Sequence, residues 1–217
     1  MGVKGLRDRI SRRARRAGLS PPPEQLELLE RYFALLARWN AKINLTAFKL
    51  SEPNDESLDR LLVEPLVACR YLPAGKLALI DIGSGGGSPA LPLAICGGRM
   101  RLTLVEAKTR KAVFLVEATR ALQLPDVKVE SSRYEQLLTR PELHESFDIL
   151  SIRAVRVETR ALLTLQAFLR PGGRIFWFRG ATGANVPSET SPPLVWEATH
   201  PLIESLRSRL VILRKER

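Results

Sequence analysis

The residues best suited to chemistry lie in a glycine-rich stretch, IDIGSGGGSPALPL, at 80–93. After Asp81, glycines occupy alternate positions, namely Gly83, Gly85 and Gly87. Closely spaced glycines let the backbone approach a ligand where a side chain would clash. The dinucleotide-binding motif requires glycine at position 88, which is Ser88 here, and no Gly-Lys-Ser/Thr sequence follows for a Walker loop. The pattern therefore indicates close contact with a ligand that neither nucleotide motif describes.

A carboxylate, Glu106, ends the next apolar run, RLTLVE at 101–106. In this position of an α/β sheet a carboxylate accepts hydrogen bonds from both ribose hydroxyls and repels a 2′-phosphate. The glycine pattern and Glu106 together favour S-adenosylmethionine, with glycine backbone against the methionine group and the carboxylate on the ribose. Two alternatives stay open. One is a surface turn beside a solvated glutamate, and the other is an NAD-type oxidoreductase, which the missing third glycine disfavours.

The composition describes a globular chain with a basic surplus. Its 217 residues, 45% hydrophobic and 26% charged, suit one well-packed core. No stretch reaches the roughly 18 uncharged apolar residues of a membrane-spanning helix, and residues 1–18 lack the apolar segment of a secretory signal. We therefore expect a cytoplasmic protein without membrane contact. The net charge of +11 favours a polyanionic partner, and nucleic acid is the first candidate.

Potential metal ligands are few. The cysteines, Cys69 and Cys96, form no CxxC pair, and only His144 and His200 could add imidazole ligands. Neither a zinc cluster nor a disulfide framework is supported, so we expect no metal and interpret both cysteines as small apolar core residues.

The first 75 residues are predicted to form a helical module. Residues 1–18 are rich in arginine with apolar residues at helical spacing, and they form either a short basic helix ended by Gly18 or a solvated tail. Ser20 and Pro21 fit the N-cap and first turn of a long amphipathic helix, which could break near Asn40. A helical pattern returns at 58–72.

Residues 76–217 are predicted to form a second part, in which strands alternate with helices. Short branched apolar runs at 77–82, 101–105, 127–130, 147–152 and 174–178 indicate strands. The intervening helical patterns lie near 89–96, 109–122 and 157–169, the last closed by a turn at 171–173. This alternation predicts a parallel sheet covered by helices on both faces. A final apolar run at 210–213 is expected to add an edge strand.

From about residue 26 onwards the chain resembles the bacterial small-subunit ribosomal RNA guanine-N7 methyltransferases, the glucose-inhibited division protein B family. The resemblance rests on six segments in order: WNAKINLT (39–46), DIGSGGGSPALPLAI (81–95), VEAKTRKAVFL (105–115), SRYE (132–135), FDILSIRAV (147–155) and LRPGGRIFWFRG (169–180). It implies a class-I S-adenosylmethionine-dependent methyltransferase with a Rossmann-like, doubly wound, mostly parallel seven-stranded sheet after an N-terminal helical module. It also implies methyl transfer to N7 of a guanine in 16S ribosomal RNA of the small subunit.

The glycine pattern and the resemblance together give the candidate cofactor contacts: Asp81, Gly83, Ser84, Gly85, Gly87, Ser88, Glu106, Arg133, Tyr134, Glu135 and Arg153. The family resemblance itself implies Gly83, Ser88, Tyr134, Glu135 and Arg153. Glu106 would hold the ribose, and backbone near Tyr134 and Glu135 would contact the adenine edge. Arg153 would pair with the methionine carboxylate or with an RNA phosphate, and it is the candidate for positioning the reactants.

Several positions depart from the family pattern. Ser88 and Ile152 stand where the family has a bulky apolar residue and a serine, and Arg179 replaces a lysine. The RH-x-x-D-S element appears as RLLVEP at 60–65, without its histidine. These changes indicate a divergent member of the family.

The chemistry implied needs no strong base, because guanine N7 attacks through a lone pair without losing a proton. Positioning can then lower the barrier by ~7–11 kcal/mol. Because positive charge develops on the base, a nearby carboxylate would help, and Glu135 and Asp148 are available.

The basic surplus supplies candidates for RNA phosphate contacts: Arg12, Arg13, Arg15, Arg16, Lys111, Arg156 and Arg179. Trp39 and Trp177 could stack a flipped base, although Trp39 lies on a helix face typical of core residues. We expect a monomer that acts on assembled or partly assembled subunits. The alternatives are a methyltransferase of this fold acting on another RNA atom or a small molecule, and a catalytically silent RNA-binding assembly factor.

Overall fold

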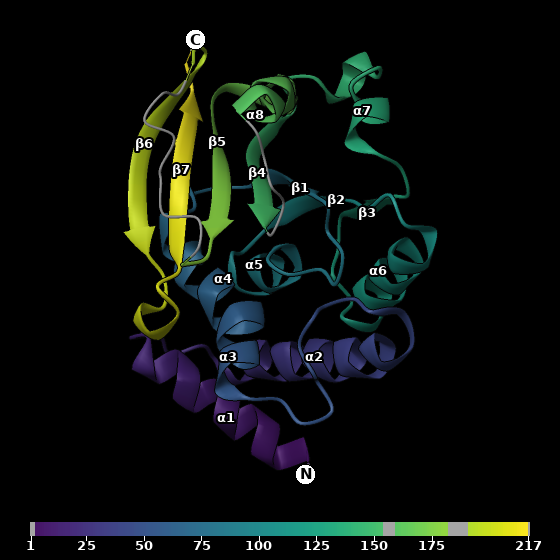
Figure 1. The fold of residues 1–217 in the computed structure, drawn as a ribbon, viewed down its shortest axis with the longest axis vertical. Coiled ribbons are helices and arrows are strands. Elements are labelled where there is room, and N and C mark those ends of the chain that lie inside the picture. The colour runs from purple at the N-terminus through teal and green to yellow at the C-terminus, as the bar shows by residue number, and fades with distance from the viewer. Residues whose placement is uncertain (1–2, 154–158, 182–190, 217) are drawn as a thin grey trace.

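The computed structural model describes residues 3–153, 159–181 and 191–216. Its first part is helical, with α1 at Val3–Arg16 and α2 at Pro23–Ile43 (Figure 1). A second helical segment joins α3 (Asp55–Leu58), the π-helical turn η1 (Asp59–Val63), α4 (Glu64–Ala68) and the 3-10 turn η2 (Cys69–Tyr71). Of the two alternatives for residues 1–18 the structure shows the helix, which Gly18 follows at φ 70°.

The start of α2 differs from the prediction. Pro22, not Ser20, occupies the N-cap position, with extended φ −64° and ψ 159° and no side-chain hydrogen bond to the helix. A residue before proline is disfavoured in the helical conformation, so the three consecutive prolines delay the helix until the last of them. The helix also continues through Asn40 and ends at Asn44, whose φ of 49° is left-handed.

Seven strands form one sheet in the order β3-β2-β1-β4-β5-β7-β6. The strands are β1 (Leu77–Ile82), β2 (Met100–Val105), β3 (Val127–Glu130), β4 (Phe147–Arg153), β5 (Leu169–Arg179), β6 (Leu194–Pro201) and β7 (Arg209–Lys215). Strands β1 to β5 pair in parallel, whereas β7 is antiparallel to both β5 and β6. The predicted mostly parallel, seven-stranded sheet is confirmed.

Helices cover both faces of this sheet. They are α5 (Ala90–Cys96), α6 (Thr109–Ala121), α7 (Tyr134–Leu137) and α8 (Thr159–Leu165), with 3-10 turns η3 (Pro141–Leu143), η4 (Gln166–Phe168) and η5 (Glu204–Leu206). Neighbouring strand residues point to opposite faces, so Leu79 and Ile80 belong to two different core clusters. The larger cluster joins the helical module to α5 and α6 (Figure 1). The division at residue 75 stays a prediction.

Three details of the last strands in the chain, β5 to β7, differ from the prediction. The strand predicted at 210–213 is not an edge strand, because β7 lies between β5 and β6. The edge strand is β6, which the sequence did not reveal because its residues 195–200 are half-buried or exposed and show no apolar run. The turn expected at 171–173 lies inside β5, where Gly172 has φ 82° and the pairing with β4 shifts register.

Candidate cofactor-binding site

The glycine turn leaves the carboxyl end of β1. Its alternating glycines all have positive φ, 73° at Gly83, 51° at Gly85 and 86° at Gly87, a conformation that other residues rarely adopt. At Gly87 a side chain is also excluded by space, because its Cβ would lie 2.5 Å from the Leu91 side chain. The alternation seen in the sequence therefore reflects a backbone that turns left-handed at every second residue.

Asp81 anchors the base of this turn. Its side chain is 1% exposed and accepts a hydrogen bond from the Ser151 hydroxyl of β4, while Ser84 Oγ donates to the Asp81 carbonyl at 3.1 Å. Burial raises the pKa of Asp81 to about 6, against the hydrogen bonds from Ser151 and Ser84 that lower it. Asp81 thus links the start of the glycine turn to β4 through hydrogen bonds.

Glu106 follows β2 and faces the same turn. Its Oε2 accepts a hydrogen bond from Gly85 N–H at 2.8 Å, and its Oε1 accepts one from Lys108 N–H at 2.8 Å. The carboxylate is 7% exposed, so it is held in one orientation between the glycine turn and the start of α6. Each oxygen keeps a further lone pair, which can accept from a hydroxyl.

The segment after β3 lies beside Glu106. The ends of β2 and β3 are aligned, because Glu106 N–H donates to the Glu130 carbonyl at 3.0 Å. Beyond that point Arg133 is the exposed N-cap of α7, Tyr134 is half-buried, and Glu135 is exposed. The pKa of Tyr134 is raised, mainly by burial and also by the negative charge of the neighbouring Glu135.

Arg153 ends β4 in a buried cluster with two residues of the second helical segment. Its Nη1 donates to the Arg60 carbonyl, and its Nη2 lies 3.3 Å from Oε2 of the fully buried Glu64. Glu64 Oε1 accepts from Arg60 Nη1 at 2.9 Å, and the Arg153 guanidinium lies 4.7 Å from the centre of the Phe178 ring. Burial lowers the pKa of Arg153, and the Glu64 charge opposes this.

This cluster leaves hydrogen-bonding capacity unused. Nε and Nη2 of Arg153 are buried and find no hydrogen-bond acceptor among the described residues, since the contact of Nη2 with Glu64 has ion-pair distance without hydrogen-bond alignment. Ser132 Oγ, just before α7, is likewise buried without a hydrogen-bond partner in the part of the chain that the structure describes. Such groups are costly unless something satisfies them, so they mark places for polar ligand atoms.

The helical module contacts the glycine turn at two points. Ser88 Oγ donates to the Leu61 carbonyl of the π-helical turn at 2.8 Å, and Tyr32 hydroxyl donates to the Gly86 carbonyl at 2.7 Å. Ser88 therefore connects the glycine turn to η1. Tyr32 and Glu64 were missed by sequence reasoning; the one available signal was a lone acid, Glu64, in the apolar run LLVEP.

The predicted RNA contacts do not all lie free on the surface. Arg12, Arg15 and Arg16 are exposed on α1, whereas Arg13 pairs with Asp59, with Nε to Oδ1 at 2.8 Å, and with Asp55 at 3.0 Å. Lys111 lies in the first turn of α6, and Arg179 is placed 4.2 Å from the Trp177 ring centre. Arg156 lies outside the described residues.

Three other candidates are placed away from the chemistry. Trp177 is 7% exposed with Arg179 over its ring, and Trp39 packs edge-on against Phe114 at 5.9 Å, so neither offers a free face to a base. Asp148 lies near the amino end of β4, where it accepts from Ala78 N–H at 2.7 Å and pairs with Arg170. Asp148 therefore lies at the amino ends of the strands, away from the glycine turn. Of the two carboxylates considered for stabilising charge on the base, only Glu135 remains a candidate.

Metal-ligand groups and membrane-spanning helices were sought only among the described residues, 3–153, 159–181 and 191–216. Within them, no group of three or more His, Cys, Asp or Glu side chains could hold a metal ion. Nor is any helix there both long and apolar enough to cross a membrane.

Solved structures place the fold in a class. A protein of Haemophilus influenzae described as a methylase, HI0767, shares 15% identity with a TM-score of 0.54, and the match covers 69% of this chain and 84% of that one. Pyrococcus horikoshii TYW2, in complex with MeSAdo, shares 13% identity with a TM-score of 0.53, over 71% and 62% of the two chains. The sheet order and the glycine turn define the fold of the class-I S-adenosylmethionine-dependent methyltransferases.

Sequence comparison gives the family. The sequence model described as rRNA small subunit methyltransferase G, GidB, matches residues 25–191. Ribosomal RNA small subunit methyltransferase G of Xanthomonas euvesicatoria is 36% identical over 195 residues, covering 86% of this chain and 85% of that protein. The Bacillus cytotoxicus protein of the same name is 33% identical, over 76% and 68% of the two chains. This chain belongs to the rRNA small subunit methyltransferase G family, and the predicted resemblance is confirmed.

Proposed function

We propose that this protein transfers the methyl group of S-adenosylmethionine to N7 of a guanine in 16S ribosomal RNA. The observation that carries the proposal is the fixed pairing of Glu106 with the glycine turn, at the carboxyl ends of β1 and β2, in a chain of this family. In open α/β sheets this edge is where ligands bind.

The residues present fit this cofactor. The positive-φ glycine turn offers backbone without side chains, and Glu106 offers lone pairs at the position where class-I methyltransferases hold a ribose. Nε and Nη2 of Arg153, which lack a hydrogen-bond acceptor in the described part of the chain, suit an anionic group, either the methionine carboxylate or an RNA phosphate. The unpaired Ser132 hydroxyl and the backbone before α7 suit the polar edge of adenine.

The chemistry places few demands on the protein. When bound, S-adenosylmethionine supplies a methyl group on a positively charged sulfur, and the bond from sulfur to methyl breaks as the N7 lone pair forms the new bond. No proton leaves the base, so the chain needs no general base. Its residues instead orient the two reactants in line and exclude water. The exposed carboxylate of Glu135 is the candidate for stabilising the positive charge that develops on the guanine.

RNA binding is assigned to the basic surface. We propose phosphate contacts for the exposed arginines of α1, for Lys111 and for Arg179, with Arg156 retained from the sequence. Arg13 contributes through its ion pairs with Asp59 and Asp55, which hold α1 in place. We further propose that the chain acts as a cytoplasmic monomer on assembled or partly assembled subunits, because charge alone does not select one guanine.

Calorimetric titration with S-adenosylmethionine tests the enzyme proposal against a silent assembly factor. We expect heat of binding and a raised thermal midpoint at millimolar cofactor. If the titration gives no heat and the thermal midpoint does not shift at that concentration, enzymatic function is contradicted. Mass analysis of nucleosides from modified RNA then separates N7 of guanine from another target atom.

A further inference from the structure

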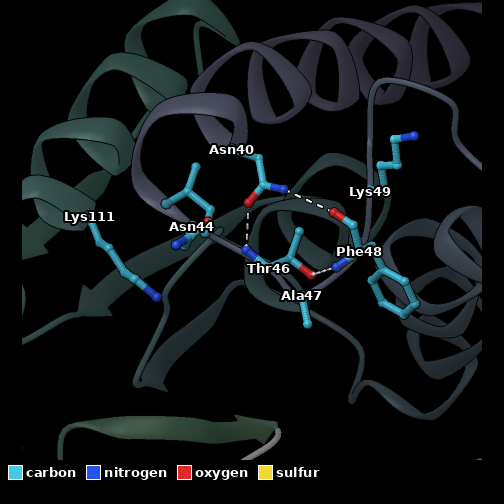
Figure 2. A pocket seen from close by; sticks show the side chains of 8 residues that line it. Asn40, Asn44, Thr46, Ala47, Phe48, Lys49 and Lys111 are labelled. Atoms are coloured by element: carbon cyan, nitrogen blue, oxygen red, sulfur yellow. Dashed lines mark hydrogen bonds between the residues drawn. The ribbon is translucent and has the colours of Figure 1, made fainter.

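An open hollow of about 460 Å³ lies between the helical module and α6. Its walls are the loop at 44–49, Asn40 from α2 and Lys111 from α6 (Figure 2). In Figure 2 the Lys111 side chain extends from α6 at one side of the labelled residues, and Lys49, the last residue of the loop, lies at the other side. None of the lining residues is acidic.

The loop wall of this hollow is rigidly built. Asn40 holds it with both side-chain atoms, since Nδ2 donates to the Phe48 carbonyl at 3.0 Å and Oδ1 accepts from Thr46 N–H at 2.8 Å (Figure 2). Thr46 Oγ1 accepts from Phe48 N–H at 3.4 Å, which leaves the hydroxyl proton to donate elsewhere. Asn44 has φ 49°, and its exposed amide lines the hollow.

Charge in the hollow is positive and little compensated. Lys111 makes no ion pair with any described residue, and it lies in the first turn of the 13-residue helix α6, whose dipole adds partial positive charge. Lys49 pairs only with Glu52 among the described residues, at 3.8 Å between two exposed side chains, a contact of little strength in water. The hollow therefore suits an anion.

The hollow adjoins the proposed cofactor site. Leu45 lines the hollow and is itself buried, and a side chain at Gly86 would lie 3.5 Å from the Leu45 carbonyl. On the other wall, Lys108 at the start of α6 donates its N–H to Glu106. The loop at 44–49 thus lies close to the glycine turn, and α6 begins beside Glu106.

We propose that this hollow binds the sugar-phosphate backbone of the RNA strand next to the target guanine. Lys111 and Lys49 pair with phosphates, and Asn44 and Thr46 offer hydrogen bonds to a ribose hydroxyl or a base edge. This inference rests on the proposed function, because it places the RNA beside the cofactor. It assigns substrate contacts to the loop at 44–49.

The test compares two double variants of the full chain. Lys49→Gln/Lys111→Gln removes the charges of the hollow, and Lys42→Gln/Lys76→Gln removes two exposed lysines outside it. Binding is measured by filter retention of small subunits from cells lacking this gene, across a salt series, with cofactor affinity measured in parallel. We expect the hollow variant to bind subunits about tenfold more weakly and with a salt slope reduced by about 1 to 2, because two phosphate contacts are lost. Cofactor affinity should stay within about twofold of the unmodified chain.

The outcomes are distinguishable. Equal weakening in both double variants would show only a general charge effect and overturn the proposed hollow. A loss of cofactor affinity in the hollow variant would assign the hollow to the cofactor and also overturn it. If the unmodified chain neither binds nor methylates subunits, the proposed function itself fails.

A neutral variant tests the hydrogen-bonding wall. Asn44→Gly keeps the left-handed backbone and removes only the amide. We expect kcat/KM for subunits to fall about fivefold or more with unchanged cofactor affinity, as for loss of a substrate hydrogen bond. An unchanged kcat/KM would contradict the role of Asn44.

Discussion

Glu106 is the residue on which the cofactor assignment most depends. Replacing Glu106 by alanine should raise the dissociation constant for S-adenosylmethionine tenfold or more, since charge-assisted hydrogen bonds contribute ~1.5–3 kcal/mol. Glu106→Gln should give an intermediate loss, because the amide oxygen can still accept from Gly85. Glu197→Ala, on the distant strand β6, is the matched control. Unchanged affinity in Glu106→Ala, measured by calorimetry, would show that the ribose assignment is wrong.

Asp81 makes the stability of the fold depend on pH. Burial raises its pKa to about 6, so the folded state binds a proton more tightly than the unfolded state does. The contribution of Asp81 to stability is therefore lost as pH rises from about 4 to about 6, by ~2–3 kcal/mol in total.

The variant Asp81→Asn isolates this effect. Relative to Asp81→Asn, the free energy of unfolding of the unmodified chain should fall between pH 4 and pH 6 and then stay level. Urea unfolding at a series of pH values measures it. A difference between the two proteins that does not change with pH would contradict the raised pKa.

At the scale of elements, two adjacent arginines of α1 have different roles. Asp59 is 2% exposed and has Arg13 as its partner, so Arg13→Ala leaves a buried carboxylate unpaired. We expect Arg13→Ala to lower the free energy of unfolding by about 2 kcal/mol or more. Arg12→Ala should leave stability unchanged and weaken subunit binding. If thermal and subunit-binding measurements show equal effects for both variants, α1 is not divided into a packing face and an RNA face.

The strands show which elements a sequence reveals. Strand β1 is buried at all six positions, and such a continuous apolar run is recognised directly. Strand β6 is half-buried or exposed after Leu194, with Trp196 51% exposed, so its pattern is not distinct from that of a loop. The start of α2 was misplaced because three prolines in succession move it, although each alone would fit a helix start.

The residues of the candidate site also fall into two groups, those that the sequence reveals and those that only the fold brings together. The glycine turn and Glu106 are local in sequence, and their spacing reflects backbone geometry, so they were predicted. The cluster of Arg153 with Glu64 and Arg60 joins segments that the fold brings together, and nothing in either segment specifies the other. The same holds for Ser88, whose hydroxyl donates to the Leu61 carbonyl of a segment distant in the sequence.

At the scale of the whole molecule, the helical module and the sheet act as one unit. Tyr32 and Ser88 bind the module to the glycine turn, Glu64 binds it to the end of β4, and the larger core cluster spans both parts. In the proposed function, the module therefore forms one wall of the cofactor site as well as part of the RNA-binding surface.

The most direct test of the central claim is nucleoside mass spectrometry of 16S ribosomal RNA from cells with and without this gene. The account predicts one N7-methylguanosine that is present with the gene, absent without it, and restored by the unmodified chain but not by Glu106→Ala. An identical set of modified nucleosides in both strains, or the loss of a methyl group at a different atom, would contradict it.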